Sequence, residues 1–334
     1  GNQVDYTFGS SADGQTITIT HVSTSDVDTV TNVETLRFDD GDIGVSADAN
    51  GLVLTGSAGV DNITIVGSVA VTVLGQDDAD ILTGSTGNDI IEGGSGDDTI
   101  DGGAGDDLLT GDAGDDTIVG GAGADVAVFV GNLEDYTFAS SADGLTVTIT
   151  DTNTGDVDTV TGVETLRFAD ADIGMSRDGT DDHMILTGTS QADTITVVGD
   201  VGIEVLGTGG DDILTGDRGD DILEGSAGDD DIAGGVGDDT IDAGADDDLV
   251  AGGAGEDTID GGAGDDDIAG GAGDDTIDGS AGDDILAGDA GDDTIDGGAG
   301  DDIAVFAGSQ ADYTFESSAD GETITVTHVS TSDV

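Results

Sequence analysis

An aspartate recurs every nine residues within a glycine-rich frame, and this spacing constrains the fold more than any other feature of the chain. A representative copy is GGSGDDTID, from Gly93 to Asp101, with the recurring aspartate at the sixth position and an aliphatic residue at the eighth. A fixed period of this kind predicts a solenoid in which each repeat is one small structural unit. The seventeen sixth-position aspartates form two runs, Asp80, Asp89, Asp98, Asp107, Asp116, Asp125 and then Asp212, Asp221, Asp230, Asp239, Asp248, Asp257, Asp266, Asp275, Asp284, Asp293, Asp302.

Alternate repeats differ from each other, which indicates how many of them make one coil. In the second run the triplet Thr-Ile-Asp returns every eighteen residues, at Thr240, Thr258, Thr276 and Thr294. We infer two nonapeptides per coil, with alternate triplets forming two stacked parallel sheets and the eighth-position Ile, Leu or Val directed inward. The last three residues of each repeat suit a short strand, and the six before them suit a turn with positive φ angles.

A longer repeat separates the nonapeptide runs. The segment 4–43 recurs as 134–173, and a third copy begins at Ala311 and is cut off at Val334, so we expect about two units of a larger tandem protein. These spacers alternate Thr with Ile or Val, as antiparallel strands do, and Ser-Ala-Asp-Gly at 11–14 and 141–144 fits a hairpin turn. An isolated nonapeptide-like segment precedes each run, at 56–64 and 188–196, and we interpret it as a first turn followed by a bulged loop.

The charge of the chain excludes several functions. The formal net charge is -72, from 76 acidic residues against four basic ones, and all four are Arg. Nucleic-acid binding and docking on anionic membranes both require clustered Lys and Arg, so neither is expected. Without Cys the chain has no disulfide or thiolate metal site, and no apolar run is long enough to span a bilayer.

Rows of carboxylates on stacked coils repel one another, and a single aliphatic residue per repeat makes a thin core. Bound divalent cations would neutralise these rows and join the coils, so that metal binding would contribute directly to folding. The available ligands are carboxylates and peptide carbonyls. Hard oxygen ligands favour Ca²⁺ over Zn²⁺ or Cu²⁺, and Mg²⁺ is disfavoured because it keeps its waters and prefers a strict octahedron.

The repeat GGAGDDTID, from Gly270 to Asp278, resembles the RTX (hemolysin-type) calcium-binding nonapeptide GGxGxDxUx, whose fold is a parallel β-roll. In that family each Ca²⁺ is held by carbonyls from positions two and four of one turn, carbonyls from positions one and three of the turn one coil later, and both sixth-position aspartates. Carried over to this chain, one such site would use Gly94, Gly96, Asp98, Gly111, Ala113 and Asp116. The resemblance implies four such pairs in the first run and nine in the second, so roughly a dozen ions.

Some copies depart from the family pattern, and others carry additional charge. Asp78 and Asp246 replace the fourth-position glycine and Ala243 replaces the first, so distorted or empty sites are predicted there. The fifth-position aspartates, such as Asp97, are interpreted as surface charge. Arg37 and its counterpart Arg167 are each expected to neutralise a nearby acid.

The resemblance predicts an all-β chain of parallel β-roll (RTX β-solenoid) blocks separated by small antiparallel β spacer modules. The expected domains are a spacer at 1–50, a first roll at 51–130, a second spacer at 131–182, a second roll at 183–307 and a truncated third spacer at 308–334.

We expect a secreted calcium-binding structural module of a long repetitive extracellular protein, such as an adhesin, a surface layer or a matrix fibre, which folds and stiffens on binding Ca²⁺. No catalytic residues and no enzymatic activity are predicted, and the expected partners are calcium ions, with self-association or a cell-surface target. The resemblance also implies bacterial type I export to the cell surface or exterior. Two alternatives stay open: the non-catalytic C-terminal RTX region of a type I-secreted enzyme or toxin, and a calcium buffer or sensor.

Overall fold

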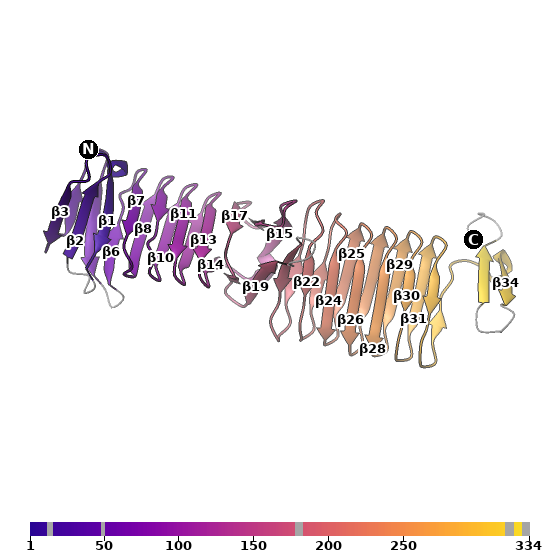
Figure 1. Ribbon diagram of the computed structural model, residues 1–334. Coiled ribbons are helices and arrows are strands. Elements are labelled where there is room, and N and C mark those ends of the chain that lie inside the picture. Colours follow the sequence, from indigo (N-terminus) through magenta and orange to yellow (C-terminus); the bar gives the residue numbers. More distant parts are fainter. Residues whose placement is uncertain (12–15, 48–50, 178–182, 318–323, 329–334) are drawn as a thin grey trace. The chain divides into compact units, whose positions relative to one another are not determined.

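Short strands stacked coil upon coil make up most of both units into which the chain divides, Gly1–Met184 and Ile185–Val334 (Figure 1). The computed structural model describes residues 1–11, 16–47, 51–177, 183–317 and 324–328. Within these ranges the chain forms strands and three 3₁₀ turns but no α-helix, and none of the helical segments could cross a membrane.

The first unit contains two spacers and the first roll. The strands and 3₁₀ turns of the first spacer are η1 (Gln3–Asp5), β1 (Tyr6–Ser10), β2 (Thr16–His21), β3 (Val27–Thr31), β4 (Thr35–Arg37) and β5 (Asp42–Ala47). The roll comprises β6 (Leu52–Thr55), β7 (Asn62–Val66), β8 (Val71–Asp77), β9 (Ile81–Thr83), β10 (Ile90–Ser95), β11 (Thr99–Ala104), β12 (Leu108–Ala113), β13 (Thr117–Ala122) and β14 (Val126–Val128). The second spacer comprises η2 (Leu133–Asp135), β15 (Tyr136–Ser140), β16 (Thr146–Asp151), β17 (Val157–Thr161), β18 (Thr165–Arg167) and β19 (Asp172–Arg177).

The second unit contains the longer roll and a hairpin. Its roll comprises β20 (Met184–Thr187), which begins at the unit boundary, then β21 (Thr194–Thr196), β22 (Glu204–Leu206), β23 (Ile213–Thr215), β24 (Ile222–Ala227), β25 (Asp231–Val236), β26 (Thr240–Ala245), β27 (Leu249–Ala254), β28 (Thr258–Ala263), β29 (Asp267–Ala272), β30 (Thr276–Asp278), β31 (Ile285–Ala290), β32 (Thr294–Asp296) and β33 (Ile303–Ala304). The third spacer contributes η3 (Gln310–Asp312), β34 (Tyr313–Ser317) and β35 (Ile324–His328).

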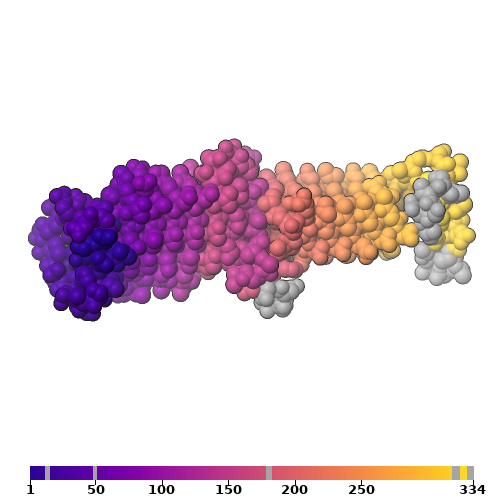
Figure 2. Space-filling model, turned by 90° about the horizontal axis from the view of Figure 1, so that it is seen from above, coloured from indigo at the N-terminus to yellow at the C-terminus, as the bar shows by residue number. Residues whose placement is uncertain are grey.

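The register of the rolls confirms two nonapeptides per coil. In the first unit β11 pairs in parallel with β13, placing Ile100 beside Ile118, eighteen residues on. Even-numbered and odd-numbered strands form two separate parallel sheets in each roll, and Figure 2 shows the coils succeeding one another in sequence order. Fifteen of the seventeen eighth-position side chains, Ile100 and Ile118 among them, are 1% exposed or less, and only Ile295 and Ala304, in the last coil of the second roll, are more exposed.

The strands are longer than the predicted triplets. Strand β11 pairs with β13 from Thr99 to Asp101, skips Gly102, and resumes at Gly103 and Ala104. The turn itself is confined to positions four to six. A residue with positive φ at position four allows the chain to bend there, as Gly105 does at φ 121°.

Asp78 and Asp246, which replace the fourth-position glycine, adopt the same left-handed backbone, at φ 68° and 84°. The Asp246 amide donates to the Ala263 carbonyl at 2.7 Å, as the fourth-position Gly237 amide donates to the Ala254 carbonyl at 2.9 Å. The backbone of these two turns is therefore regular, and the distorted or empty calcium sites expected there stay a prediction. Aspartate tolerates this conformation better than most residues other than glycine.

The first coil of each roll is one residue longer than the rest. Ile63 pairs with Leu82 and Ile195 with Leu214, each nineteen residues apart, whereas later partners are eighteen apart. The isolated segments 56–64 and 188–196 thus form the first turns of the two rolls, as predicted, and the following loop contains the additional residue.

The two spacers of the first unit are antiparallel sheets with small aromatic cores. In the second spacer Phe138 is fully buried, and its ring meets Phe168 edge-to-face at 6.1 Å. The turn predicted at 141–144 is present, because the Gly144 amide donates to the Ser141 carbonyl at 2.9 Å, whereas the turn predicted at 11–14 lies mostly outside the described residues.

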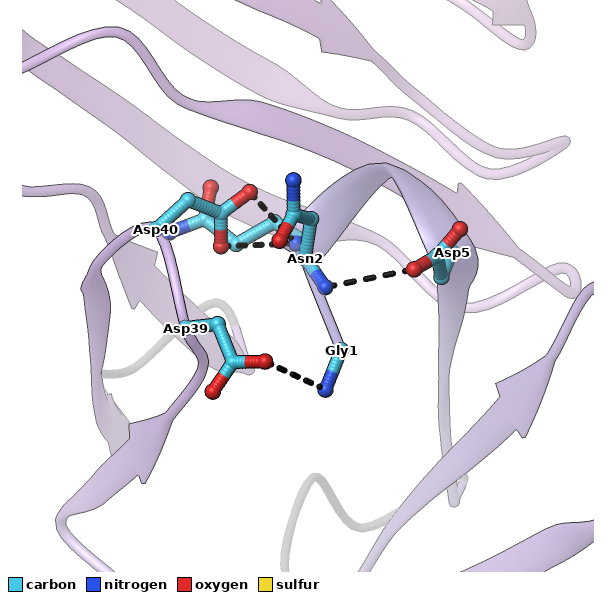
Figure 3. Close-up of polar contacts among 6 residues, drawn as sticks. Gly1, Asn2, Asp5, Asp39 and Asp40 are labelled. Carbon is cyan, nitrogen blue, oxygen red and sulfur yellow. Dashed lines mark hydrogen bonds and ion pairs between the residues drawn. The ribbon is translucent and has the colours of Figure 1, made fainter.

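Carboxylates hold the start of the first spacer against the loop between β4 and β5 (Figure 3). The Gln3 amide donates to both oxygens of Asp40, at 2.8 and 2.9 Å, and the Asn2 amide donates to Asp5 Oδ2 at 3.2 Å. The terminal amine of Gly1 lies 3.3 Å from Asp39 Oδ2. These contacts connect the segment before β1 to the loop between β4 and β5.

Arg37 and Arg167 each pair with an aspartate five residues on, as expected. The Arg37 Nε–H donates to Asp42 Oδ1 at 2.7 Å, and the Arg167 Nε–H donates to Asp172 Oδ1 at 3.0 Å. Both pairs are solvent-exposed, so their contribution to stability is small.

Spacer strands continue the sheets of the first roll. Strand β1 pairs in parallel with β7, and strands β17 and β18 pair in parallel with β13 and β14. The first spacer thus pairs with the roll that follows it, and the second spacer pairs with the roll that precedes it. The domain boundaries expected from the sequence stay a prediction.

Truncation of a single aliphatic side chain in the core of a roll should lower the stability of that roll strongly. Replacing Ile259, which is 1% exposed, with Ala should lower the free energy of unfolding of the folded second roll by about 2–5 kcal/mol, because the cavity cannot collapse between fixed coils. Leu249→Ala is the matched control, since this side chain is 51% exposed and its loss should change stability by less than about 0.5 kcal/mol. Equal denaturation midpoints for the two variants, measured in saturating calcium, would contradict the core assignment.

Candidate metal sites

The sixth-position aspartates lie inside the turns and not on the surface. Fifteen of the seventeen are 3% exposed or less, and only Asp293 and Asp302, in the last coil of the second roll, are half-buried. Each of these aspartates lies immediately before a strand, as Asp98 lies before β11. The eighth-position side chain, two residues later, points into the core and so fixes the direction of the backbone at the aspartate. Buried carboxylates are rare unless a partner compensates for the lost hydration.

One oxygen of each carboxylate has a regular partner. The Asp98 amide donates to Asp116 Oδ1 at 2.7 Å, and Asp116 is the sixth-position residue one coil later. The same bond recurs in the second roll, for example from the Asp239 amide to Asp257 Oδ1 at 2.9 Å. The aspartates thus form ladders along each roll, in which every carboxylate accepts from the preceding coil.

The other oxygen has no partner in the protein. In thirteen of the seventeen aspartates Oδ2 is buried without a hydrogen bond, which is costly for a charged acceptor. These residues are Asp80, Asp98, Asp107, Asp116, Asp125, Asp212, Asp230, Asp239, Asp248, Asp257, Asp266, Asp275 and Asp284. In Asp89 and Asp221, which belong to the first coil of their ladders, Oδ2 instead accepts from the amides of Ser85 and Asp217.

A peptide carbonyl from the next coil faces the same space as the orphaned oxygen. A Cβ built on Gly102 would lie 2.5 Å from Asp107 Oδ2 and 2.7 Å from the Gly120 carbonyl oxygen. One built on Gly252 would lie 2.5 Å from Asp257 Oδ2 and 2.6 Å from the Gly270 carbonyl oxygen. The first-position glycine therefore leaves open a small space into which a carboxylate and a carbonyl both project, and this donor set fits a hard cation.

The structure places the predicted carbonyl ligands in two adjacent turns. A Cβ built on Gly93 would lie against Asp98 Oδ2 and 2.9 Å from the Gly111 carbonyl oxygen, so these two predicted ligands converge. The Gly96 amide donates to the Ala113 carbonyl at 2.8 Å, which joins the same turns. Gly94 has φ 115° and pairs with Asp112 of the next coil. All six residues thus lie together, and their role as ligands stays a prediction.

In the described ranges no point brings together three or more His, Cys, Asp or Glu side chains. A metal site in these turns would therefore combine at most two carboxylates with peptide carbonyls as its oxygen donors.

Four acidic residues outside the predicted set join the ladders. Asp61 and Asp193, the sixth residues of the isolated segments, are buried, and their amides donate to Asp80 and Asp212. Their sixth position in the nonapeptide-like segments 56–64 and 188–196 could have identified them from the sequence as members of the ladders. Asp158 and Glu164, from the second spacer, lie outside any nonapeptide frame, so sequence reasoning missed them.

The fifth-position aspartates also form a ladder, in the opposite direction. The Asp115 amide donates to Asp97 Oδ1 at 3.1 Å, and the Asp265 amide donates to Asp247 Oδ1 at 2.8 Å. These pairs are exposed, which agrees with their interpretation as surface charge, although each also links two coils.

Burial raises the pKa of the sixth-position carboxyls. Desolvation, opposed by the backbone N–H donor and reinforced by neighbouring carboxylates, raises the pKa to about 7 for Asp116, Asp239 and Asp248. The same causes raise the pKa to about 6 for Asp80, Asp107 and Asp212. Without a bound cation, several of these turns therefore hold a proton near neutral pH.

Comparison with known proteins supports the repeat pattern. A model of the RTX calcium-binding nonapeptide repeat matches residues 74–109, 93–127, 206–241, 242–277 and 269–304. Curated proteins gave no match. Among solved structures, the chain is similar to the extracellular lipase LipA from Serratia marcescens, with 19% identity and a TM-score of 0.22 over 75% of this chain. The chain covers 35% of the length of that lipase.

The raised pKa values predict that the calcium-free rolls lose stability as the pH rises. An aspartate with an unfolded pKa near 3.8 and a folded pKa of about 7, such as Asp239, binds more protons when folded, so its favourable contribution is complete below 3.8 and is lost towards 7. Circular dichroism in calcium-depleted buffer should show more β structure at pH 5 than at pH 7.5. With calcium present the order should reverse, because protons compete for the carboxylates; the same pH response in both buffers would contradict this.

Neutralising one ladder carboxylate should have opposite effects with and without calcium. In Asp239→Asn the amide keeps an acceptor for the Asp221 N–H but removes a buried charge, so the calcium-free chain should retain more β structure in circular dichroism at pH 7.5 than the unsubstituted chain does. Calcium affinity should fall by about tenfold or more, because ligand charge sets affinity. Asp238→Asn, at the exposed fifth position, should leave calcium affinity within about twofold by titration calorimetry. Equal affinities for the two variants would argue against the ladder as the binding site.

Proposed function

Because the chain is an RTX-repeat protein that carries calcium-binding nonapeptides, we propose that it serves as a structural module that folds and stiffens on binding Ca²⁺. The observation that carries this proposal is the row of buried Oδ2 atoms without a hydrogen-bond partner, most of which face a peptide carbonyl of the next coil. The proposed ligands are the seventeen sixth-position aspartates together with turn carbonyls such as those of Gly94, Gly96, Gly111 and Ala113.

Ions in these turns would supply positive charge and several oxygen contacts, which the protein alone lacks. Thirteen ions, one for each pair of sixth-position aspartates a coil apart, would offset 26 of the 72 net negative charges. The amide-to-Oδ1 ladder would orient every carboxylate so that the second oxygen faces the neighbouring carbonyl. The fold of each coil would then depend on the ion beneath it.

This dependence suits a protein that works outside the cell. In a low-calcium cytosol the unneutralised carboxylates would repel and oppose stacking, so the chain would remain unfolded during export. In extracellular calcium the sites would fill and the coils would form. We therefore propose a secreted, extracellular location, in keeping with the type I export that is common among RTX proteins.

The spacers support a structural role over a catalytic one. Their parallel pairings, β1 with β7 and β17 with β13, are suited to joining a roll on either side. Alternating rolls and spacers would extend one chain by pairing its sheets end to end. We propose that this design serves a long repetitive protein, such as an adhesin, a surface layer or a matrix fibre, that self-associates or binds a cell-surface target.

Chelation provides the direct test. Excess EGTA at pH 7.5 should abolish most of the β signal in circular dichroism, and added calcium should restore it in one cooperative transition whose midpoint coincides with ion binding. A β spectrum that is unchanged in EGTA would refute calcium-dependent folding. Weak, independent sites that fill without any change in the spectrum would favour a calcium buffer or sensor instead.

A further inference from the structure

The second spacer continues the first roll in register. Strand β17 pairs with β13 so that Thr159 lies beside Thr117 and Val160 beside Ile118. These partners are the seventh and eighth residues of a nonapeptide, which makes Asp158 the equivalent of a sixth-position aspartate. By the same reasoning, the pairing of Thr165 with Val126 in strands β18 and β14 gives Glu164 the sixth position of the next half-coil.

Asp158 and Glu164 take over the hydrogen bonds of the missing ladder residues. The Asp116 amide donates to Asp158 Oδ1 at 2.9 Å, and the Asp125 amide donates to Glu164 Oε2 at 2.8 Å. Within the roll, the corresponding bond from the Asp98 amide to Asp116 Oδ1 measures 2.7 Å. The spacer thus supplies one final coil, although its sequence has no glycine-rich nonapeptide.

The last aspartates of the roll still have an oxygen without a partner. Oδ2 of Asp116 and Oδ2 of Asp125 are buried without a hydrogen bond, in residues that are 1% and 0% exposed. A Cβ built on Gly120 would lie 2.8 Å from Asp125 Oδ2 and against the carbonyl oxygen of Gly162. Gly162 therefore occupies the place that Gly120 holds for Asp107 one coil earlier.

The connecting turn is shorter than in a nonapeptide. Only Val163 separates Gly162 from Glu164, where a regular repeat has four residues between its first and sixth positions. Gly162 makes this short turn at φ 62°. Asp158 is 8% exposed, whereas Glu164 is exposed, so the second of these positions opens to solvent.

We propose that Asp158 and Glu164 complete two further calcium sites, one with Asp116 and one with Asp125 and the Gly162 carbonyl, which fasten the second spacer to the end of the first roll. This inference rests on the proposed function, because it extends the same ladder. It differs from a simple hydrogen-bonded cap, in which the two acids would satisfy the last amides without any ion.

The first spacer offers matched controls within the same chain. Its segment VDTVTNVETLR repeats VDTVTGVETLR of the second spacer, so Asp28 and Glu34 correspond to Asp158 and Glu164. Both residues are exposed. In the described part of the chain β3 pairs only with β2, and β4 only with β5, so neither acid faces an orphaned aspartate of a roll.

Native mass spectrometry of the full chain in calcium counts ions per monomer and provides the test. Asp158→Asn and Glu164→Gln keep an oxygen acceptor for the amide but remove the charge. Each should bind one ion fewer than the unsubstituted chain, and the double variant two fewer. Asp28→Asn and Glu34→Gln should bind the full number, and circular dichroism in saturating calcium should show that all variants are folded.

An unchanged ion count in the folded Asp158→Asn and Glu164→Gln variants would overturn the two sites and leave a cap only. An unsubstituted chain that binds no calcium would instead refute the proposed function itself. Hydrogen exchange of the unsubstituted chain provides a second test, which measures the protection of the ladder amides and needs no variant. At saturating calcium the Asp116 and Asp125 amides should be as protected as the Asp98 amide, and markedly weaker protection would contradict the proposal.

Discussion

The buried sixth-position carboxylate is the group on which the rest of the rolls depends. Its Oδ1 accepts an amide hydrogen from the preceding coil, which sets the stacking register, while its Oδ2 is left without a protein partner in most copies. A charge in this position cannot remain uncompensated at neutral pH, so it is either protonated or bound to a cation. Stacking, proton uptake and metal binding are thus three properties of one side chain.

Rolls and spacers are stabilised in different ways. A roll buries one aliphatic residue per nonapeptide, such as Ile259, and relies on its ladders for the rest. The second spacer has an aromatic core, in which Phe129 stacks on Phe168 at 5.4 Å, and antiparallel strands. The last coil of the first roll pairs its parallel strands with this spacer, β13 with β17 and β14 with β18.

Much of this architecture follows from periodicity. The nine-residue aspartate spacing and the eighteen-residue return of Thr-Ile-Asp correctly predicted two repeats per coil, two parallel sheets and buried eighth-position side chains. The strands extend further than predicted because the residues at positions two and three, such as Gly103 and Ala104, continue the pairing after a skipped residue. The regular backbone of the turns at Asp78 and Asp246 could not be predicted, since backbone angles at such positions depend on the neighbouring coil.

Local repetition within the chain was enough to establish the coil, its inward face and an oxygen-rich acidic turn, because each of these depends on residues less than one coil apart. Which acids end a ladder was decided only by tertiary pairing. Asp28 and Asp158 lie in nearly identical segments, yet Asp28 is exposed and Asp158 is buried against Asp116, 42 residues away. The difference arises because strand β17 has the edge of a roll to pair with, and no local pattern specifies that partner.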